Sequence, residues 1–151
     1  MSSNFKYKSG LGSVGAYQMS GVPFVKQIGT IPVNGGTPVQ VDFPGVTKYI
    51  IVENLDDADI LRVGFSAAGI TGSQAGSQDI GCYWELLPNS AVTVTRAKIR
   101  MDVRVSSIFL LSDHGSNTIA GAQVHAGCTV IPTGTLPDNW RGIAGVGGVF
   151  S

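Results

Sequence analysis

Short apolar runs separated by turn residues recur along the chain, and they constrain its fold more than any other feature. Residues 39–43 alternate between apolar odd positions and polar even positions, which is typical of a half-buried strand. Residues 48–53 are β-branched and aromatic, and the turn pair Pro44-Gly45 precedes them. Similar runs cover residues 60–65, 82–87, 92–95, 97–105, 108–111 and 120–131. About eight short strands with this spacing predict an all-β sandwich or barrel.

The alternation changes phase once, between residues 92–95 and the run that follows. Val92 and Val94 put the inward face on even numbers. From residue 97 onward the inward face falls on odd numbers, at Ile99, Met101, Val103 and Val105. A pattern of period two cannot change phase without an extra residue. We therefore expect a bulge or a tight turn at Thr95-Arg96.

The charge content is low and balanced. Lys plus Arg number 10 and Asp plus Glu number 10, so the formal net charge is zero, and a neutral chain has no general attraction to nucleic acid. Charged residues make up 13% of the chain, against about 25% in ordinary soluble domains. Because a free monomer normally keeps a charged surface, we expect neighbouring subunits to cover part of this one.

No targeting or membrane signal is apparent. The first eight residues have no apolar core for a signal peptide, and no run of 18 uncharged apolar residues exists. We expect synthesis and assembly in the cytoplasm and no membrane span. Two cysteines, Cys82 and Cys128, are too few for a disulfide scaffold. The favoured interpretation is two buried thiols, and a bridge stays open only if their strands are neighbours.

Both ends of the chain differ from its middle, which divides it into an N-terminal arm (1–25), a sandwich domain (26–132) and a C-terminal arm (133–151). The arms combine many of the 21 glycines with aromatic and aliphatic residues, whereas flexible linkers lack aromatic residues. We expect these arms to dock on neighbouring subunits. The predicted interface anchors are Phe5, Tyr7, Leu11, Tyr17, Trp140 and Phe150.

Motifs for cofactors, metals and catalysis are weak. Residues 10–15 match the G-x-G-x-x-G dinucleotide pattern, but no strand precedes them and no acidic residue follows at the required distance. His114 and His125 have no second histidine close in sequence for a cupin-type metal site. The acidic residues Asp56, Asp57 and Asp59 fit a polar turn better than a Ca²⁺ site. We expect no cofactor, no metal and no enzymatic activity.

One basic stripe runs along a predicted strand, with Arg96, Lys98, Arg100 and Arg104 on one face and Asp102 between the last two. Subunit contact and a solvated face explain this stripe equally well. Nucleic-acid binding ranks third, because no aromatic residues are interleaved to stack on bases.

Several segments resemble the small single-jelly-roll capsid proteins that form the pentons, or five-fold vertices, of large icosahedral DNA viruses. Residues 7–24 look like the N-terminal arm of that family, and residues 43–54, 61–65 and 83–86 follow its strand rhythm. The segment Trp140-Arg141-Gly142 departs from the family pattern. The resemblance implies a single jelly-roll sandwich with Gly-rich arms. It further implies a homopentamer that contacts neighbouring capsid proteins at the vertices of a virion.

A second hypothesis is a decoration, cement or tail-associated receptor-binding protein of a tailed marine phage. Jelly rolls also bind sugars on exposed aromatic rings, and Tyr83 and Trp84 could serve this purpose. The favoured interpretation places at least one of the two in the core, because neighbours along a strand face opposite ways.

Overall fold

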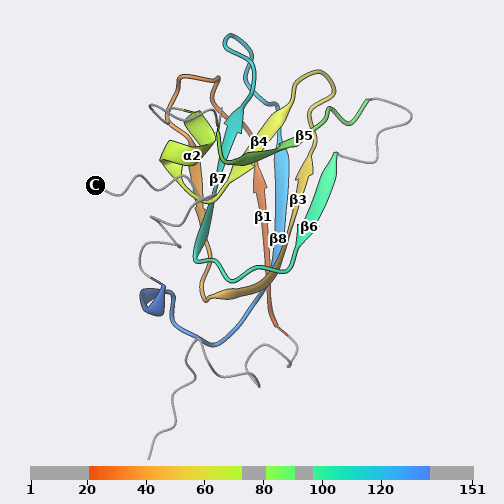
Figure 1. Cartoon of the computed structure of the whole chain (residues 1–151). Coiled ribbons are helices and arrows are strands. Elements are labelled where there is room, and N and C mark those ends of the chain that lie inside the picture. Colours follow the sequence, from red (N-terminus) through yellow and green to blue (C-terminus); the bar gives the residue numbers. More distant parts are fainter. Residues whose placement is uncertain (1–20, 73–80, 91–96, 137–151) are drawn as a thin grey trace, which may run out of the picture.

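The computed structural model describes residues 21–72, 81–90 and 97–136, which form two antiparallel sheets of four strands packed face to face (Figure 1). The first sheet has the strand order β1-β8-β3-β6 and the second has the order β2-β7-β4-β5. The strands are β1 (Val22–Ile28), β2 (Val39–Asp42), β3 (Thr47–Asn54), β4 (Leu61–Gly64), β5 (Tyr83–Leu86), β6 (Lys98–Met101), β7 (Ser107–Ser112) and β8 (Ala122–Cys128). The all-β prediction is confirmed.

The strand pairs are nested. The first strand pairs with the eighth, the second with the seventh, the third with the sixth and the fourth with the fifth, all antiparallel. This is the pattern of one long hairpin with its tip between β4 and β5. Two further antiparallel pairings, β3 with β8 and β4 with β7, join the nested pairs side by side into the two sheets.

The core lies between the sheets and follows the alternation of the strands. Ile50 and Val52 of β3 and Val124 of β8 point inward and are fully buried. Their neighbours Ile51 and His125 point outward and are half-buried. Burying one such aliphatic side chain stabilises the fold by roughly 1.5–3 kcal/mol. At the β1 side of the sandwich, the Phe24 and Phe43 rings meet edge to face with centroids 5.2 Å apart.

Seven of the eight strands lie where the sequence predicts them, although β6 ends at Met101 rather than at residue 105. The strand β1 was not predicted, and its first residues Val22–Val25 belong to the range assigned to the N-terminal arm. At the other end, the 3-10 helix η1 (Thr133–Thr135) leads to Leu136, which packs with Val46 and Ile131. The predicted strand at 92–95 and the predicted bulge at Thr95-Arg96 lie outside the described residues.

One short helix, α2 (Ala67–Thr71), packs on the outer side of β4 and β7. The Ser66 hydroxyl accepts a hydrogen bond from the Gly69 N–H and caps its start. Gly72 ends it with a φ of 71°, a conformation that favours glycine. The helices of the described residues are too short to cross a membrane.

Candidate functional site

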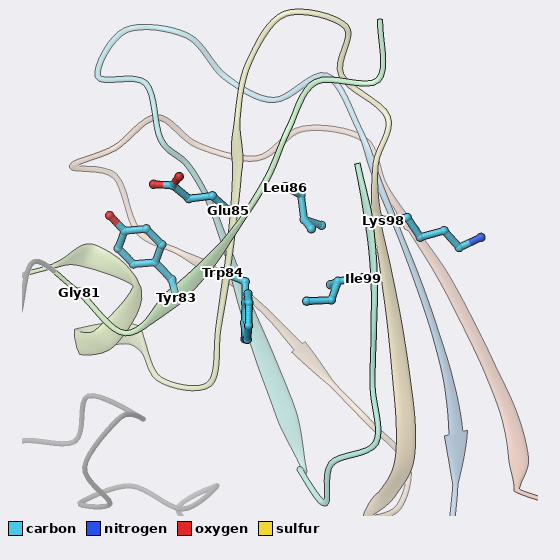
Figure 2. A pocket seen from close by; sticks show the side chains of 7 residues that line it. All are labelled: Gly81, Tyr83, Trp84, Glu85, Leu86, Lys98 and Ile99. Carbon is cyan, nitrogen blue, oxygen red and sulfur yellow. The ribbon is translucent and has the colours of Figure 1, made fainter. Parts of the chain in front are cut away.

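A cleft of about 360 Å3 opens between β5 and β6, the edge strands of the two sheets on the same side of the sandwich. The inward side chains Trp84, Leu86 and Ile99 form its apolar surface, and Figure 2 shows them turned toward the space between the strands. Trp84 is 55% exposed, whereas Leu86 belongs to the buried core. We call this feature the Trp84 cleft.

The charged side chains beside the Trp84 cleft are directed away from it. Figure 2 shows the ends of Glu85 and Lys98 pointing to opposite outer faces of the sandwich. Lys98 lies 3.9 Å from the Glu53 carboxylate, its neighbour on β3. A binding partner in this cleft therefore meets mainly apolar side chains.

Tyr83 takes the opposite direction from Trp84, as expected of neighbours on a strand. The Arg62 guanidinium lies over the Tyr83 ring, 4.3 Å from its centroid. Tyr83 is half-buried and Trp84 is exposed, so neither belongs to the buried core. The interpretation that placed one of them in the core is wrong, because β5 is an edge strand.

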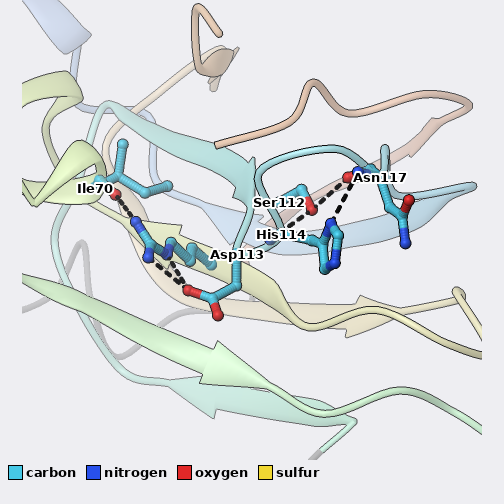
Figure 3. A network of polar contacts seen from close by, with 6 residues as sticks. Ile70, Ser112, Asp113, His114 and Asn117 are labelled. Atoms are coloured by element: carbon cyan, nitrogen blue, oxygen red, sulfur yellow. Dashed lines mark hydrogen bonds and ion pairs between the residues drawn. The ribbon is translucent and has the colours of Figure 1, made fainter. Parts of the chain in front are cut away.

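Arg62 is the centre of a polar network on the outer side of the second sheet, next to α2. Its Nε donates to the Asp113 carboxylate at 2.6 Å, and its Nη1 donates to the Ile70 carbonyl of α2 at 3.2 Å (Figure 3). Arg62 is only 8% exposed. The alternation of the strand predicts that Arg62 points to the opposite face from the core residues Leu61 and Val63. It carries no signal that a helix covers the face on which Arg62 lies.

The predicted basic stripe is present in part. Lys98 and Arg100 are exposed on one face of β6, and Arg104 is exposed in the segment after it, whereas Arg96 lies outside the described residues. Arg100 stacks over the Tyr49 ring at 4.3 Å and lies 3.3 Å from the Asp102 carboxylate. The charges of Lys98 and Arg100 therefore interact with neighbours on the same surface.

The acidic turn is held by Asp56. One carboxylate oxygen accepts from the Ala58 and Asp59 N–H groups, and the other accepts from the Ala120 N–H at 2.7 Å. The expectation of a polar turn capped by an Asp side chain is confirmed at Asp56. Among the described residues, no three His, Cys, Asp or Glu side chains are grouped in a way that could hold a metal ion.

The two histidines lie in different environments. His114 is exposed in the loop after β7, and its Nδ1 accepts a hydrogen bond from the Ser116 N–H group. The same Nδ1 accepts a second hydrogen bond from the Asn117 N–H group (Figure 3). His125 is half-buried on the outer face of β8, between Val25 of β1 and Ile51 of β3.

Both cysteines are free thiols. Cys128 is buried on the inner face of β8, and its burial raises the pKa of the thiol, although a hydrogen bond involving the Gly45 backbone opposes the change. Cys82 is half-buried, so the expectation of two buried thiols holds only for Cys128.

The predicted arm anchors, which are Phe5, Tyr7, Leu11, Tyr17, Trp140 and Phe150, lie outside the described residues. Comparison with protein-family models, with curated proteins and with solved structures found no match to this chain.

Proposed function

We propose that this protein is a structural capsid subunit with a jelly-roll fold, which closes the vertices of an icosahedral virion as a penton or minor capsid protein. The observation that carries the proposal is the nested strand pairing, in which each strand pairs with its counterpart from the other end of the chain. A jelly roll is a double sheet of eight strands arranged as two Greek keys, and it is a common fold of capsid proteins.

Two further observations support a role in assembly. Charged residues make up only 13% of the chain, which is low for a protein whose whole surface faces water. In addition, the described residues expose Val22, Val25 and Val130 near one edge of the sandwich and Trp84 at another. Buried subunit contacts would remove such side chains from water.

In this proposal the function is geometric and involves no chemistry. Copies of the sandwich repeat around a closed cyclic axis, and the Gly-rich arms reach neighbouring capsid proteins. The partners are other copies of the same chain and adjacent capsid subunits, and the protein resides in the virion after assembly in the host cytoplasm.

The native mass across a range of concentrations tests this proposal. A pentamer of the 15.7 kDa chain has a mass of about 78.5 kDa, and we expect a discrete species of that size by native mass spectrometry. A trimer would instead favour a decoration or receptor-binding protein. A chain that stays monomeric at high concentration and does not enter reconstituted capsids would contradict the vertex role.

A second candidate function is glycan binding by a decoration or tail-associated protein, and the exposure of Trp84 in a cleft favours it. Sugars stack their apolar faces on such rings. A glycan array probed with the wild-type protein and with Trp84→Ala distinguishes this function. Binding that disappears in the variant would support it, and the absence of binding would contradict it.

A further inference from the structure

We propose that the free edge of β5 binds an extended peptide segment of a partner protein, which adds to the second sheet as a further strand and places apolar side chains in the Trp84 cleft. We call this segment the guest strand. It carries two apolar residues with one basic residue between them. The inference goes beyond the proposed vertex role, because the site is complete in one copy of the chain.

The edge of β5 has none of the usual protection against strand addition. β5 is the last strand of the second sheet, and among the described residues it pairs only with β4. Proteins protect such edges with proline or with charged side chains that point inward. β5 has the sequence Tyr-Trp-Glu-Leu, and its inward side chains are Trp84 and Leu86. A further strand can therefore pair with it.

The hydrogen bonds between β4 and β7 determine the direction of the backbone groups in β4. The Asp113 N–H donates to the Ile60 carbonyl at 2.9 Å, just before the first paired residue of β4. Antiparallel strands alternate between residues that exchange hydrogen bonds with the partner strand and residues that do not. Counting on from Ile60, Leu61 and Val63 turn their N–H and C=O groups away from β7 and toward β5.

The alternation continues into β5. Leu86 and Trp84 are opposite these two β4 residues, so their backbone groups face β4. Tyr83 and Glu85 take the other positions of the strand, and their N–H and C=O groups point to the free edge. A residue of the guest strand opposite Glu85 can therefore exchange two hydrogen bonds with it.

The same geometry assigns the side chains of the guest strand. The guest residue opposite Glu85 has its side chain on the outer face of the sheet, beside the Glu85 side chain. The guest residues before and after it point inward, where Trp84, Leu86 and Ile99 line a hollow of about 360 Å3 (Figure 2). The Trp84 cleft thus receives apolar side chains from alternate positions of the guest strand.

Glu85 determines the charge of the guest residue opposite it. Its carboxylate is exposed and forms no ion pair with another described residue. Arg62, its neighbour on β4, is already paired with Asp113. Opposite charges directly across two strands stabilise the pairing, whereas like charges weaken it. A lysine or arginine is therefore favoured opposite Glu85.

The other edge strand at the cleft, β6, suits a guest strand less well. Five of the seven residues that line the cleft lie between Gly81 and Leu86, and only two belong to β6. The outward charges of β6 also have neighbours already, since Lys98 lies beside Glu53 and Arg100 stacks on a tyrosine. The unpaired charge and most of the apolar surface are on β5.

An extended peptide matches this site better than a sugar does. The free N–H and C=O groups repeat along the edge at the spacing of a strand, which a polypeptide reproduces. The charged ends of Glu85 and Lys98 are turned away from the cleft (Figure 2). The hydroxyl groups of a sugar would therefore meet few polar partners inside it.

A synthetic peptide tests the site on the full chain. The probe is Thr-Leu-Lys-Leu-Thr with blocked ends, and isothermal titration calorimetry measures its affinity. We expect Trp84→Ala to weaken binding by roughly 30-fold, as for an interface hot spot. Val25→Ala is the matched control, because Val25 is a similarly exposed apolar residue on β1, and it should leave the affinity unchanged. Equal affinities for the wild type and Trp84→Ala would contradict the proposal.

Strand pairing has a test that needs no protein variant. Methylation of the backbone nitrogen of the peptide lysine removes the N–H that pairs with Glu85 and keeps every side chain, so it should abolish binding. The Tyr83 and Glu85 N–H groups should exchange rapidly in the free protein and slowly with the unmethylated peptide. The Trp84 N–H should be protected in both states. Protection of the Tyr83 and Glu85 amides in the free protein would show that the edge already has a partner, and would overturn the site.

A change of charge tests the register. A peptide with glutamine in place of lysine should bind the wild type about 3-fold more weakly, and Glu85→Gln should remove this difference. A preference for lysine that persists in Glu85→Gln would show that the basic residue does not lie opposite Glu85.

The peptide measurements are independent of the native mass. A pentamer that binds no peptide would overturn this inference and keep the vertex role, whereas a monomer that binds the peptide as described would support the inference alone. Binding of a glycan at Trp84, without binding of the peptide, would assign the cleft to sugar and overturn the inference.

Discussion

At the scale of single residues, Asp56 connects its own turn to a segment that is distant in sequence. Its carboxylate accepts from the N–H groups of Ala58 and Asp59 within its own turn and of Ala120 before β8. Burial alone would raise the pKa of Asp56, but the three hydrogen bonds outweigh burial and lower the pKa. The charged form is therefore the one that the fold stabilises.

We expect the stability of the protein to fall in acid because of Asp56. A carboxylate whose pKa is lower in the folded state contributes stability above its unfolded pKa of about 3.9, and loses it as the pH falls through the folded value. Asp56→Asn should cost roughly 2 kcal/mol near neutral pH and less at about pH 3. Urea unfolding at both pH values measures this difference.

Asp57→Asn is the matched control, because the Asp57 side chain is exposed in the same turn. It should leave the free energy of unfolding nearly unchanged at both pH values. A cost for Asp56→Asn that stays constant with pH would show that the carboxylate charge is not the source of the stability.

Residue roles could be predicted from sequence where they depend on neighbours in the chain. The capping role of an Asp in the 56–59 turn is local, so its residue types predict it. The burial of Arg62 depends on α2 and on Asp113, which approach only in the folded protein. No pattern around position 62 contains that information.

At the scale of elements, Arg62 fastens α2 to the sheet. The helix has five residues, too few to be stable by itself. Its contact with the sheet includes the hydrogen bond from Arg62 to the Ile70 carbonyl and the packing of fully buried Ile70. The position of α2 therefore depends on a residue outside the helix.

Arg62→Met should destabilise the protein by roughly 2–3 kcal/mol, because it leaves the Asp113 carboxylate without its partner in a partly buried place. Hydrogen exchange should accelerate at the Ile70 N–H, and urea unfolding gives the free energy. Arg100→Met is the matched control, since Arg100 also stacks on a tyrosine at 4.3 Å but is 57% exposed.

The control should cost at most about 1 kcal/mol, as exposed ion pairs and stacked cations do. Equal costs for the two variants would show that the burial of Arg62 contributes nothing. An unchanged exchange rate at Ile70 would show that Arg62 does not hold the helix.

The strands with clear alternation were predictable, and β1 and α2 were not. The β1 sequence contains Pro23 and places exposed residues on both faces, so period two is lost. Because β1 is an edge strand, both of its faces are partly in contact with water. Its sequence therefore does not need an apolar residue at every second position. The helix α2 is shorter than the window in which a helical period can be recognised.

At the scale of the whole molecule, β8 determines whether the first sheet can form. It lies between β1 and β3 and pairs with both of them. Strand spacing predicted a sandwich or barrel, but spacing cannot tell which strands become neighbours. The Trp84 cleft follows from that order, because it lies where the edge strands of the two sheets face each other.

A chain that ends at Gly121 should not fold, because β1 loses its partner and β3 loses one of two. Far-ultraviolet circular dichroism and the dispersion of amide proton signals measure this outcome. A chain that ends at Leu136 keeps all eight described strands and should remain folded. A folded protein without β8 would contradict the central role of that strand.

The nested pairing also has a consequence for biosynthesis. The ribosome completes β1 about a hundred residues before its partner β8, and translation adds roughly 5–20 residues per second. The first strand therefore waits several seconds or more for its partner, and until β8 has been made the nascent chain carries β1 as an unpaired strand whose inward side chains have no sheet to pack in.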